Sequence, residues 1–315
     1  MTNLNPKIVF FGTPQLATPT LRALIDNNLK PVLVITQPDK PVNRSSELIA
    51  SPVKQLALDN SIEVLQPANK QELSDIFNEL EVDLGVLVAY GMIIPEAILS
   101  KPKHGILNLH PSLLPKYRGP SPIQTTLLNN DKLTGVSIIK LTSLMDAGPI
   151  VFQEKINIED DDNAQSLSDK LFNLGAEMIV KILWRYLGGE IKPAIQDESA
   201  VSMTKLIDRD DGKVNWQKKA TEIISQFKAF YPWPGIFSYL DNKRLKIVNL
   251  GLLEGDFSPN LVPGELFLGP NKGLAIKCSQ GAIQLTSVQL EGKKEMSGQD
   301  FLRGQTDLIG KKLIS

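Results

Sequence analysis

An amide and an imidazole two positions apart, Asn108 and His110, end an apolar run and are the residues best suited to chemistry. In an extended strand alternate side chains share a face, so both would point one way while Leu107 and Leu109 pack on the other. An amide N–H can donate to an oxyanion without titrating, and an imidazole can transfer a proton. Taken alone, such a pair is more typical of a strand-end histidine bonded to a backbone carbonyl, so the surrounding residues must decide.

A carboxylate, Asp146, follows a second apolar run at 135–141, whose β-branched residues predict a strand. In open parallel sheets, ligands bind in the crevice outside the carboxyl ends of the strands. If the two strands are neighbours, Asp146 should meet Asn108 and His110 there. A carboxylate beside an imidazole orients the ring and favours its charged form.

The predicted trio contains no nucleophile. The single cysteine, Cys278, is distant in the sequence and lies in a predicted strand, where packing is its expected role. Ser112 lacks the strand–turn–helix context of a nucleophile elbow. The residues therefore predict an acyl-type transfer in which a substrate amine attacks directly.

The motifs around the trio resemble the signature of the folate-dependent formyltransferases, namely Asn-x-His at 108–110, Ser-Leu-Leu-Pro-x-Tyr-Arg-Gly at 112–119 and Asp-Ala-Gly-Pro at 146–149. Further motifs resemble the methionyl-tRNA formyltransferase family within that group, and the likeness extends from the first strand to Gly304. They are IVFFGTP at 8–14, TQPD at 36–39, SPVK at 51–54, VAYGMIIP at 88–95 and FYPWPGIF at 230–237.

This resemblance implies that a formyl group passes from N10 of 10-formyltetrahydrofolate to the α-amino group of methionine on initiator methionyl-tRNA, for translation initiation. Asn108 would donate to the formyl oxygen, and His110 would help hold that oxygen or pass a proton to N10. Asp146 would orient His110 and accept a proton from the incoming ammonium. No metal is expected, since two histidines and one cysteine offer no zinc-type spacing.

The folate site is predicted in two segments. In the segment 88–95, Gly91 and Pro95 interrupt regular structure and the apolar side chains between them could wall a slot, although a buried strand end is an equally good interpretation. The segment 112–115 joins the site by resemblance. Arg118 either pairs with a loop carboxylate or stabilises the turn, and receives no catalytic role. The predicted folate-binding residues are Val88, Tyr90, Gly91, Met92, Ile93, Pro95, Ser112, Leu113, Leu114 and Pro115.

The tRNA site is predicted from the resemblance and from charge. The segment 41–50 corresponds to the family loop that inserts at the acceptor end, but it is poor in Gly and Lys around Arg44. From residue 207 onward the sequence contains 15 Lys and Arg and 12 Asp and Glu, whereas the whole chain has a net charge of −1. Charge alone also suits an ordinary solvated surface. The aromatic residues at 230–237 are expected to pack in the core and between domains. The predicted tRNA-binding residues are Arg44, Lys243, Arg244, Lys246, Lys293 and Lys294.

The elements that must position these residues alternate between strand and helix over the first part of the chain, which predicts an α/β domain with a doubly wound, mainly parallel sheet. By resemblance this sheet is a formyltransferase-like variant of the Rossmann fold. The first turn, Gly12-Thr-Pro, lacks the dinucleotide fingerprint and disfavours a nicotinamide cofactor. Strands are predicted at 7–11, 31–36, 83–89, 105–109, 136–141 and 150–156, and helices at 18–27, 52–60, 71–80 and 160–187.

The organisation into domains follows from composition. A polar stretch with Pro193 separates the α/β pattern from short runs with turn residues, which predict a helix at 220–229 and a small β-barrel. The family implies an OB-like barrel. We therefore expect a catalytic domain at 1–189, a linker at 190–211 and an OB-like tRNA-binding domain at 212–315.

Length and composition agree with a two-domain enzyme, since 315 residues with 42% hydrophobic content can fill two cores. We predict a cytoplasmic protein without membrane partners, because the sequence has neither a signal-peptide pattern nor a long apolar run. A monomer is expected as well. Two alternatives stay open. One is a formyltransferase or formyltetrahydrofolate hydrolase acting on a small molecule, and the other is a catalytically silent RNA-binding or folate-sensing protein.

Overall fold

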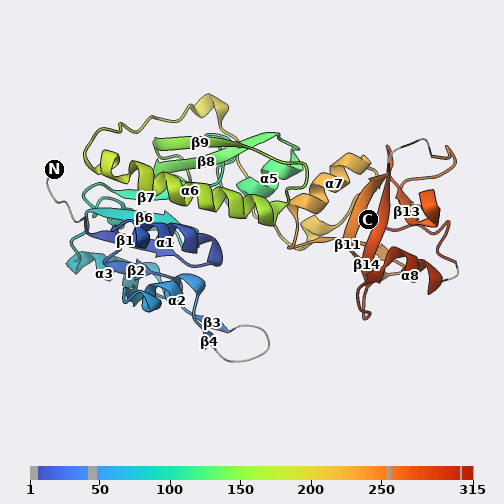
Figure 1. The fold of residues 1–315 in the computed structure, drawn as a ribbon, viewed down its shortest axis with the longest axis horizontal. Coiled ribbons are helices and arrows are strands. Elements are labelled where there is room, and N and C mark those ends of the chain that lie inside the picture. The colour runs from blue at the N-terminus through green and yellow to red at the C-terminus, as the bar shows by residue number, and fades with distance from the viewer. Residues whose placement is uncertain (1–5, 42–47, 254, 256, 306, 315) are drawn as a thin grey trace. The chain divides into compact units, whose positions relative to one another are not determined.

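The computed structural model describes residues 6–41, 48–253, 255, 257–305 and 307–314 (Figure 1). Tertiary contacts divide the chain into two compact units, which we describe separately. The first unit comprises Met1–Pro122, Lys132–Ile158 and Ser166–Thr204, and the second comprises Ile123–Asp131, Glu159–Gln165 and Lys205–Ser315.

The first unit is built on a sheet with the strand order β5-β2-β1-β6-β7-β8-β9. Strands β5, β2, β1, β6 and β7 run parallel, whereas β8 is antiparallel to both of its neighbours. The fold class predicted for this part, a mainly parallel α/β sheet, is confirmed. The strands are β1 (Ile8–Gly12), β2 (Leu33–Ile35), β5 (Glu63–Leu65), β6 (Leu84–Val88), β7 (Ile106–His110), β8 (Leu133–Lys140) and β9 (Ile150–Asn157).

Helices cover both faces of this sheet (Figure 1). On one face, α3 and α4 pack into an apolar cluster that includes Phe11 of β1, Ile35 of β2 and Ile106 of β7. On the other face, α6 lies so close to β7 that a Cβ at Gly175 would come within 2.2 Å of the Leu109 side chain. The helices are α1 (Thr18–Asp26), α2 (Pro52–Asp59), α3 (Lys70–Glu79), α4 (Glu96–Leu99), α5 (Pro122–Leu128) and α6 (Ala164–Leu187).

Local sequence explains where several elements begin. Ser51 caps α2 by accepting a hydrogen bond from the Lys54 N–H, and Pro52 takes the first helical position, as the sequence predicts. Asn69 caps α3 in the same way. Between β2 and α2 the chain forms a small antiparallel hairpin of β3 (Lys40–Pro41) and β4 (Leu48–Ile49).

The second unit contains an antiparallel, curled sheet in the order β10-β11-β14-β13-β12, with β15 paired to β14 (Figure 1). Asp241 and Asn242 join β10 to β11 with positive φ angles of 49° and 63°, as a type I′ hairpin requires. This curled sheet agrees with the predicted OB-like barrel. The elements are α7 (Ala220–Ala229), β10 (Ile236–Leu240), β11 (Lys243–Leu253), β12 (Leu266–Leu268), β13 (Leu274–Lys277), β14 (Ala282–Leu290), β15 (Met296–Ser297) and α8 (Gly298–Arg303).

The aromatic segment that precedes β10 packs only in part. Phe230 and Phe237 are buried, but Tyr231 is substantially exposed and Trp233 is 54% exposed. The prediction that these aromatic side chains pack in the core is therefore wrong for Tyr231 and Trp233. Within the described residues, no helix is long and apolar enough to cross a membrane.

Candidate active site

Strand β7 places Asn108 and His110 on one face of the sheet, as strand alternation predicts. It is flanked by β6, where Leu87 is the register partner of Asn108, and by β8, where Ser137 is the partner of His110. Leu109 points to the opposite face against α6. Both polar side chains are largely buried, with Asn108 7% and His110 4% exposed. A central strand thus presents them from a rigid support.

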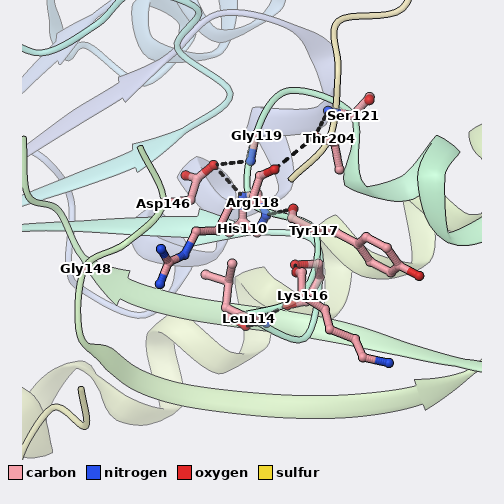
Figure 2. A network of polar contacts seen from close by, with 12 residues as sticks. His110, Leu114, Lys116, Tyr117, Arg118, Gly119, Ser121, Asp146, Gly148 and Thr204 are labelled. Atoms are coloured by element: carbon pink, nitrogen blue, oxygen red, sulfur yellow. Dashed lines mark hydrogen bonds and ion pairs between the residues drawn. The ribbon is translucent and has the colours of Figure 1, made fainter. Parts of the chain in front are cut away.

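The ring of His110 lies between a backbone carbonyl and a carboxylate (Figure 2). Its Nε2 is 2.9 Å from the Tyr117 carbonyl oxygen, and its Nδ1 is 3.6 Å from Oδ2 of Asp146. A carbonyl can only accept, so Nε2 must carry the hydrogen in this arrangement. In the neutral ring Nδ1 then carries the free lone pair, and it faces the carboxylate.

Asp146 is held in a strained conformation beside this ring. Its φ of 50° lies in the left-handed region, which residues other than glycine rarely adopt. Its Oδ2 accepts a hydrogen bond of 2.9 Å from the Gly119 N–H, at the end of the turn that follows His110 (Figure 2). The same oxygen therefore faces both the turn and the imidazole.

The structure brings His110 and Asp146 together, but the geometric reason inferred from the sequence is wrong. Because β8 is antiparallel to β7, the carboxyl end of β8 at Lys140 lies beside Leu107 and not beside His110. The loop 141–149 must run back by about three residues, roughly 10 Å of strand, to reach the imidazole. The two side chains therefore do not meet at the shared ends of parallel strands.

The amide of Asn108 is available for a ligand. Among the residues that the structure describes, none is hydrogen-bonded to the Asn108 side chain. The residue as a whole is 7% exposed, but its amide atoms are not among the fully buried side-chain atoms without a partner, so a ligand can reach them. This arrangement fits a side chain whose partner is a substrate atom.

A segment predicted as part of a linker, which we call the strap (residues 194–204), lies against the site. Ala194 bridges Ile150 of β9, and Met203 bridges Arg118 in the turn after β7. Within the strap, the Gln196 amide donates to the carbonyl oxygens of Asp146 and Gly148. Sequence reasoning missed Gln196, since a glutamine in a segment without periodicity carries no local signal.

The predicted folate residues of the segment 88–95 divide into two groups. Val88 and Tyr90 are buried, and the Tyr90 ring packs against Phe11 in the apolar cluster. Burial raises the pKa of Tyr90 to about 12, and its hydroxyl has no partner among the described residues. Met92 and Pro95 are half-buried, while Gly91 and Ile93 are exposed.

The predicted folate residues of the segment 112–115 form a turn that is largely satisfied within the protein. Ser137 donates to the Ser112 carbonyl and accepts from the Leu114 N–H, and Gln153 donates to the Leu114 carbonyl. Ser112 and Leu114 are buried, whereas Leu113 and Pro115 are half-buried. The buried pair thus supports the turn, and the half-buried pair is the part that a ligand can reach.

Comparison with known proteins gives one consistent family. The formyl transferase family matches residues 6–183, and the family described as formyl transferase, C-terminal domain, matches residues 206–306. The methionyl-tRNA formyltransferase of Thermodesulfovibrio yellowstonii is 40% identical and covers 95% of this chain and 96% of its own. The methionyl-tRNA formyltransferase of Methylococcus capsulatus is also 40% identical, and the match covers 98% of this chain and 99% of that protein. The chain belongs to the methionyl-tRNA formyltransferase family.

A solved structure shows the same fold at lower sequence identity. An N-formyltransferase from Helicobacter canadensis, in complex with folinic acid and dTDP-3-aminofucose, is 22% identical with a TM-score of 0.68. The superposition covers 89% of this chain and 98% of that one. The likeness extends over both the parallel sheet and the curled antiparallel sheet.

The predicted tRNA residues that the structure describes lie on the second unit. Arg244 stacks on the Phe237 ring at 3.8 Å. Together with Lys246, it lines a hollow of about 720 Å³ whose wall also includes Arg209 and Trp233. Arg209 and Trp233 were not predicted as binding residues. Lys243, Lys293 and Lys294 are exposed.

Arg44 lies outside the described residues, although the β3–β4 hairpin that flanks it is described. Within the described ranges, no group of three or more His, Cys, Asp or Glu side chains is placed to hold a metal ion.

Proposed function

We propose that this protein transfers the formyl group of 10-formyltetrahydrofolate to the α-amino group of the methionine carried by initiator methionyl-tRNA. The observation that carries the proposal is the pairing of His110 Nδ1 with Asp146 on the sheet face where Asn108 offers an amide without a protein partner. The curated relatives named methionyl-tRNA formyltransferase support it over nearly the full chain.

The reaction requires a new C–N bond to the methionine nitrogen and cleavage of the bond between the formyl carbon and N10. As the amine attacks, negative charge develops on the formyl oxygen, and a hydrogen bond from the Asn108 amide stabilises it. The His110–Asp146 pair first accepts a proton from the substrate ammonium, at Nδ1 or at the carboxylate, so that the neutral amine can attack. After the C–N bond has formed, the same nitrogen loses a second proton and N10 gains one as it leaves, while the first proton is released to solvent. Charge and protons then balance without a covalent enzyme intermediate.

The folate is proposed to bind between the segments 88–95 and 112–115, which follow the neighbouring strands β6 and β7. Within the described part of the chain, the backbone groups of Met92 and Ile93 have no hydrogen-bond partner, so they are free to pair with the polar edge of a pteridine. Leu113 and Pro115 supply reachable apolar surface. The neighbouring structure with folinic acid supports a folate ligand for this fold.

The tRNA is proposed to bind the basic surface of the second unit and the loop that carries Arg44. Arg244, Lys246 and Arg209 can neutralise phosphates, and the exposed Trp233 ring can stack on an unpaired base. Selection of the initiator is assigned to Arg44 by resemblance. A cytoplasmic monomer stays a prediction.

A direct test follows the formyl group. Purified protein is incubated with labelled 10-formyltetrahydrofolate and with methionine-charged initiator tRNA, methionine-charged elongator tRNA or no acceptor. Rapid label on the initiator alone is expected. Loss of donor without label on either tRNA would support the hydrolase or a small-molecule acceptor, and no loss of donor would support the silent binding protein.

A further inference from the structure

The strap reaches the catalytic loop through one side chain. Gln196 is 4% exposed, and its Nε2 donates to the carbonyl oxygens of Asp146 at 2.8 Å and Gly148 at 2.7 Å. The first carbonyl belongs to Asp146 itself, whose φ lies in the left-handed region, and the second lies two residues further along the loop. Both hydrogen atoms of one amide are thus used to fix the backbone that directly follows the Asp146 Cα.

The orientation of this amide is determined by its neighbours. The Gln196 Oε1 accepts from Nε and Nη2 of Arg118, at 3.0 and 2.9 Å, and a guanidinium can only donate. On the other side, the carbonyls of Asp146 and Gly148 can only accept. A flipped amide would face donor to donor and acceptor to acceptor, so one orientation alone satisfies all four contacts.

Arg118 anchors the amide from behind. Its guanidinium is largely buried and also pairs with Glu198 of the strap, at 2.7 Å between Nη2 and Oε1. This hydrogen bond holds the pKa of Glu198 below its ordinary value. The Arg118 backbone is bonded to the strap on both sides, to Ser202 and Thr204. The anchor is therefore rigid and belongs to the same turn as the Tyr117 carbonyl.

We propose that Gln196 is a positioning residue that holds the Asp146 carboxylate against Nδ1 of His110 during formyl transfer. The proposal rests on the proposed function of the His110–Asp146 pair. Gln196 is 4% exposed and its amide is fully used within the protein, so it acts through the loop and not on the substrate. Its loss lets the Asp146 backbone relax out of the left-handed region and carries the carboxylate away from the imidazole.

The test separates the two sides of the amide. Gln196→Glu keeps the size of the side chain and an acceptor for Arg118, but it turns the two N–H donors into an oxygen that repels the Asp146 and Gly148 carbonyls. Gln196→Met removes both the N–H donors and the oxygen acceptor without adding charge. It is the variant to use if the glutamate variant does not fold. Glu198→Gln is the matched control, because it weakens the Arg118 pair while leaving the Gln196 donors in place.

Each variant is assayed by steady-state transfer of labelled formyl to initiator methionyl-tRNA, which gives kcat and both KM values, and its thermal unfolding midpoint is measured. We expect Gln196→Glu and Gln196→Met to lower kcat by about 10- to 100-fold, as a misplacement of about 1 Å does, with both KM values nearly unchanged. Glu198→Gln should keep a kcat close to that of the wild type. Wild-type kcat in a folded Gln196→Met protein would overturn the proposal.

A double-mutant cycle distinguishes positioning from general structural damage. If Gln196 acts through the Asp146 carboxylate, then Gln196→Met should change the rate by less than about twofold in an Asp146→Asn background. An equal loss in both backgrounds would show that Gln196 acts elsewhere and would refute the proposal. A wild-type protein that transfers no formyl group at all refutes the proposed function instead, so the two failures are distinct.

Discussion

The carbonyl oxygen of Tyr117 lies 2.9 Å from Nε2 of His110, which assigns the hydrogen of the neutral ring to Nε2. Tyr117 reaches this position with a φ of 64°, in the turn that leaves β7. The same turn supplies the Gly119 N–H to Asp146. One short segment thus sets both the tautomer of the base and the place of its carboxylate.

Two amide replacements of His110 distinguish the roles of its two ring nitrogens. His110→Gln places an N–H donor near the Nε2 position and can keep the bond to Tyr117, whereas His110→Asn places its amide near Nδ1 and loses that bond. We expect both to lower kcat by about 10²- to 10⁴-fold, because neither amide titrates. His110→Asn should in addition cost about 1 kcal/mol of unfolding free energy. Rapid-quench kinetics and urea unfolding check both values, and near-normal turnover in either variant would remove His110 from proton transfer.

Asp146→Asn tests the charge of the carboxylate while keeping its shape. An asparagine oxygen can still accept from the Gly119 N–H, so the unfolding free energy should change by less than about 1 kcal/mol. The rate of formyl transfer should fall by about 10²-fold or more, since no anion then faces Nδ1 of His110. Unfolding and single-turnover rates are measured on the same preparation. A variant that loses rate and stability together would mean that the carboxylate is structural.

The sequence predicts the side chains of the site and the pairing of Asp146 with His110, but not the groups that hold this pair in place. Strand alternation is enough to place Asn108 and His110 on one face, because it depends only on residue spacing. The Tyr117 carbonyl depends on a left-handed residue that is not glycine, which no local pattern signals. Gln196 meets Asp146 across 50 positions of sequence, through a segment without periodicity.

For the fold as well, the sequence predicts some features and not others. Apolar runs predict strands such as β1, β6 and β7 to within a residue or two, and α7 within its bounds at Ala220–Ala229. A run of apolar residues does not encode strand direction, so the antiparallel β8 was not predicted. The sequence does not predict the three-residue strands β5 and β12, whereas the equally short β2 lies in the longer apolar run 31–36.

Gly148→Ala should damage the catalytic loop through its backbone. A Cβ at this position would lie 1.8 Å from the Lys140 carbonyl oxygen, so the loop or the end of β8 must move. We expect a loss of about 1 to 3 kcal/mol in unfolding free energy and of about 10-fold or more in kcat. Gly251→Ala is the control, because a Cβ there has open space around it. Unchanged activity in Gly148→Ala would show that the loop position tolerates movement.

The contribution of the Asp39 network, at the base of the β3–β4 hairpin, to the unfolding free energy should depend on pH. Hydrogen bonds from Lys54 and Gln66 hold the pKa of the Asp39 carboxyl below its ordinary value. A carboxyl whose pKa is lowered by folding stabilises the protein above its unfolded pKa, near 4, and loses that contribution as the pH falls through the folded value. Asp39→Asn should thus cost about 1 kcal/mol at pH 7 and progressively less below about pH 4. Urea unfolding across this range measures the difference, with Asp26→Asn on the exposed side of α1 as control, and a pH-independent difference would contradict the assignment.

The hollow of the second unit should bind tRNA by two separable contributions. Lys246 can neutralise a phosphate, so Lys246→Ala should reduce the dependence of log affinity on log salt by about one unit. Trp233 can stack on an unpaired base, so Trp233→Ala should weaken binding by about 1 to 3 kcal/mol and leave that salt dependence unchanged. Filter binding of methionyl-tRNA at several salt concentrations distinguishes the two, and Lys218→Ala, an exposed lysine that does not line the hollow, is the control. If Lys246→Ala and Lys218→Ala behave alike, the hollow is not where the phosphate backbone lies.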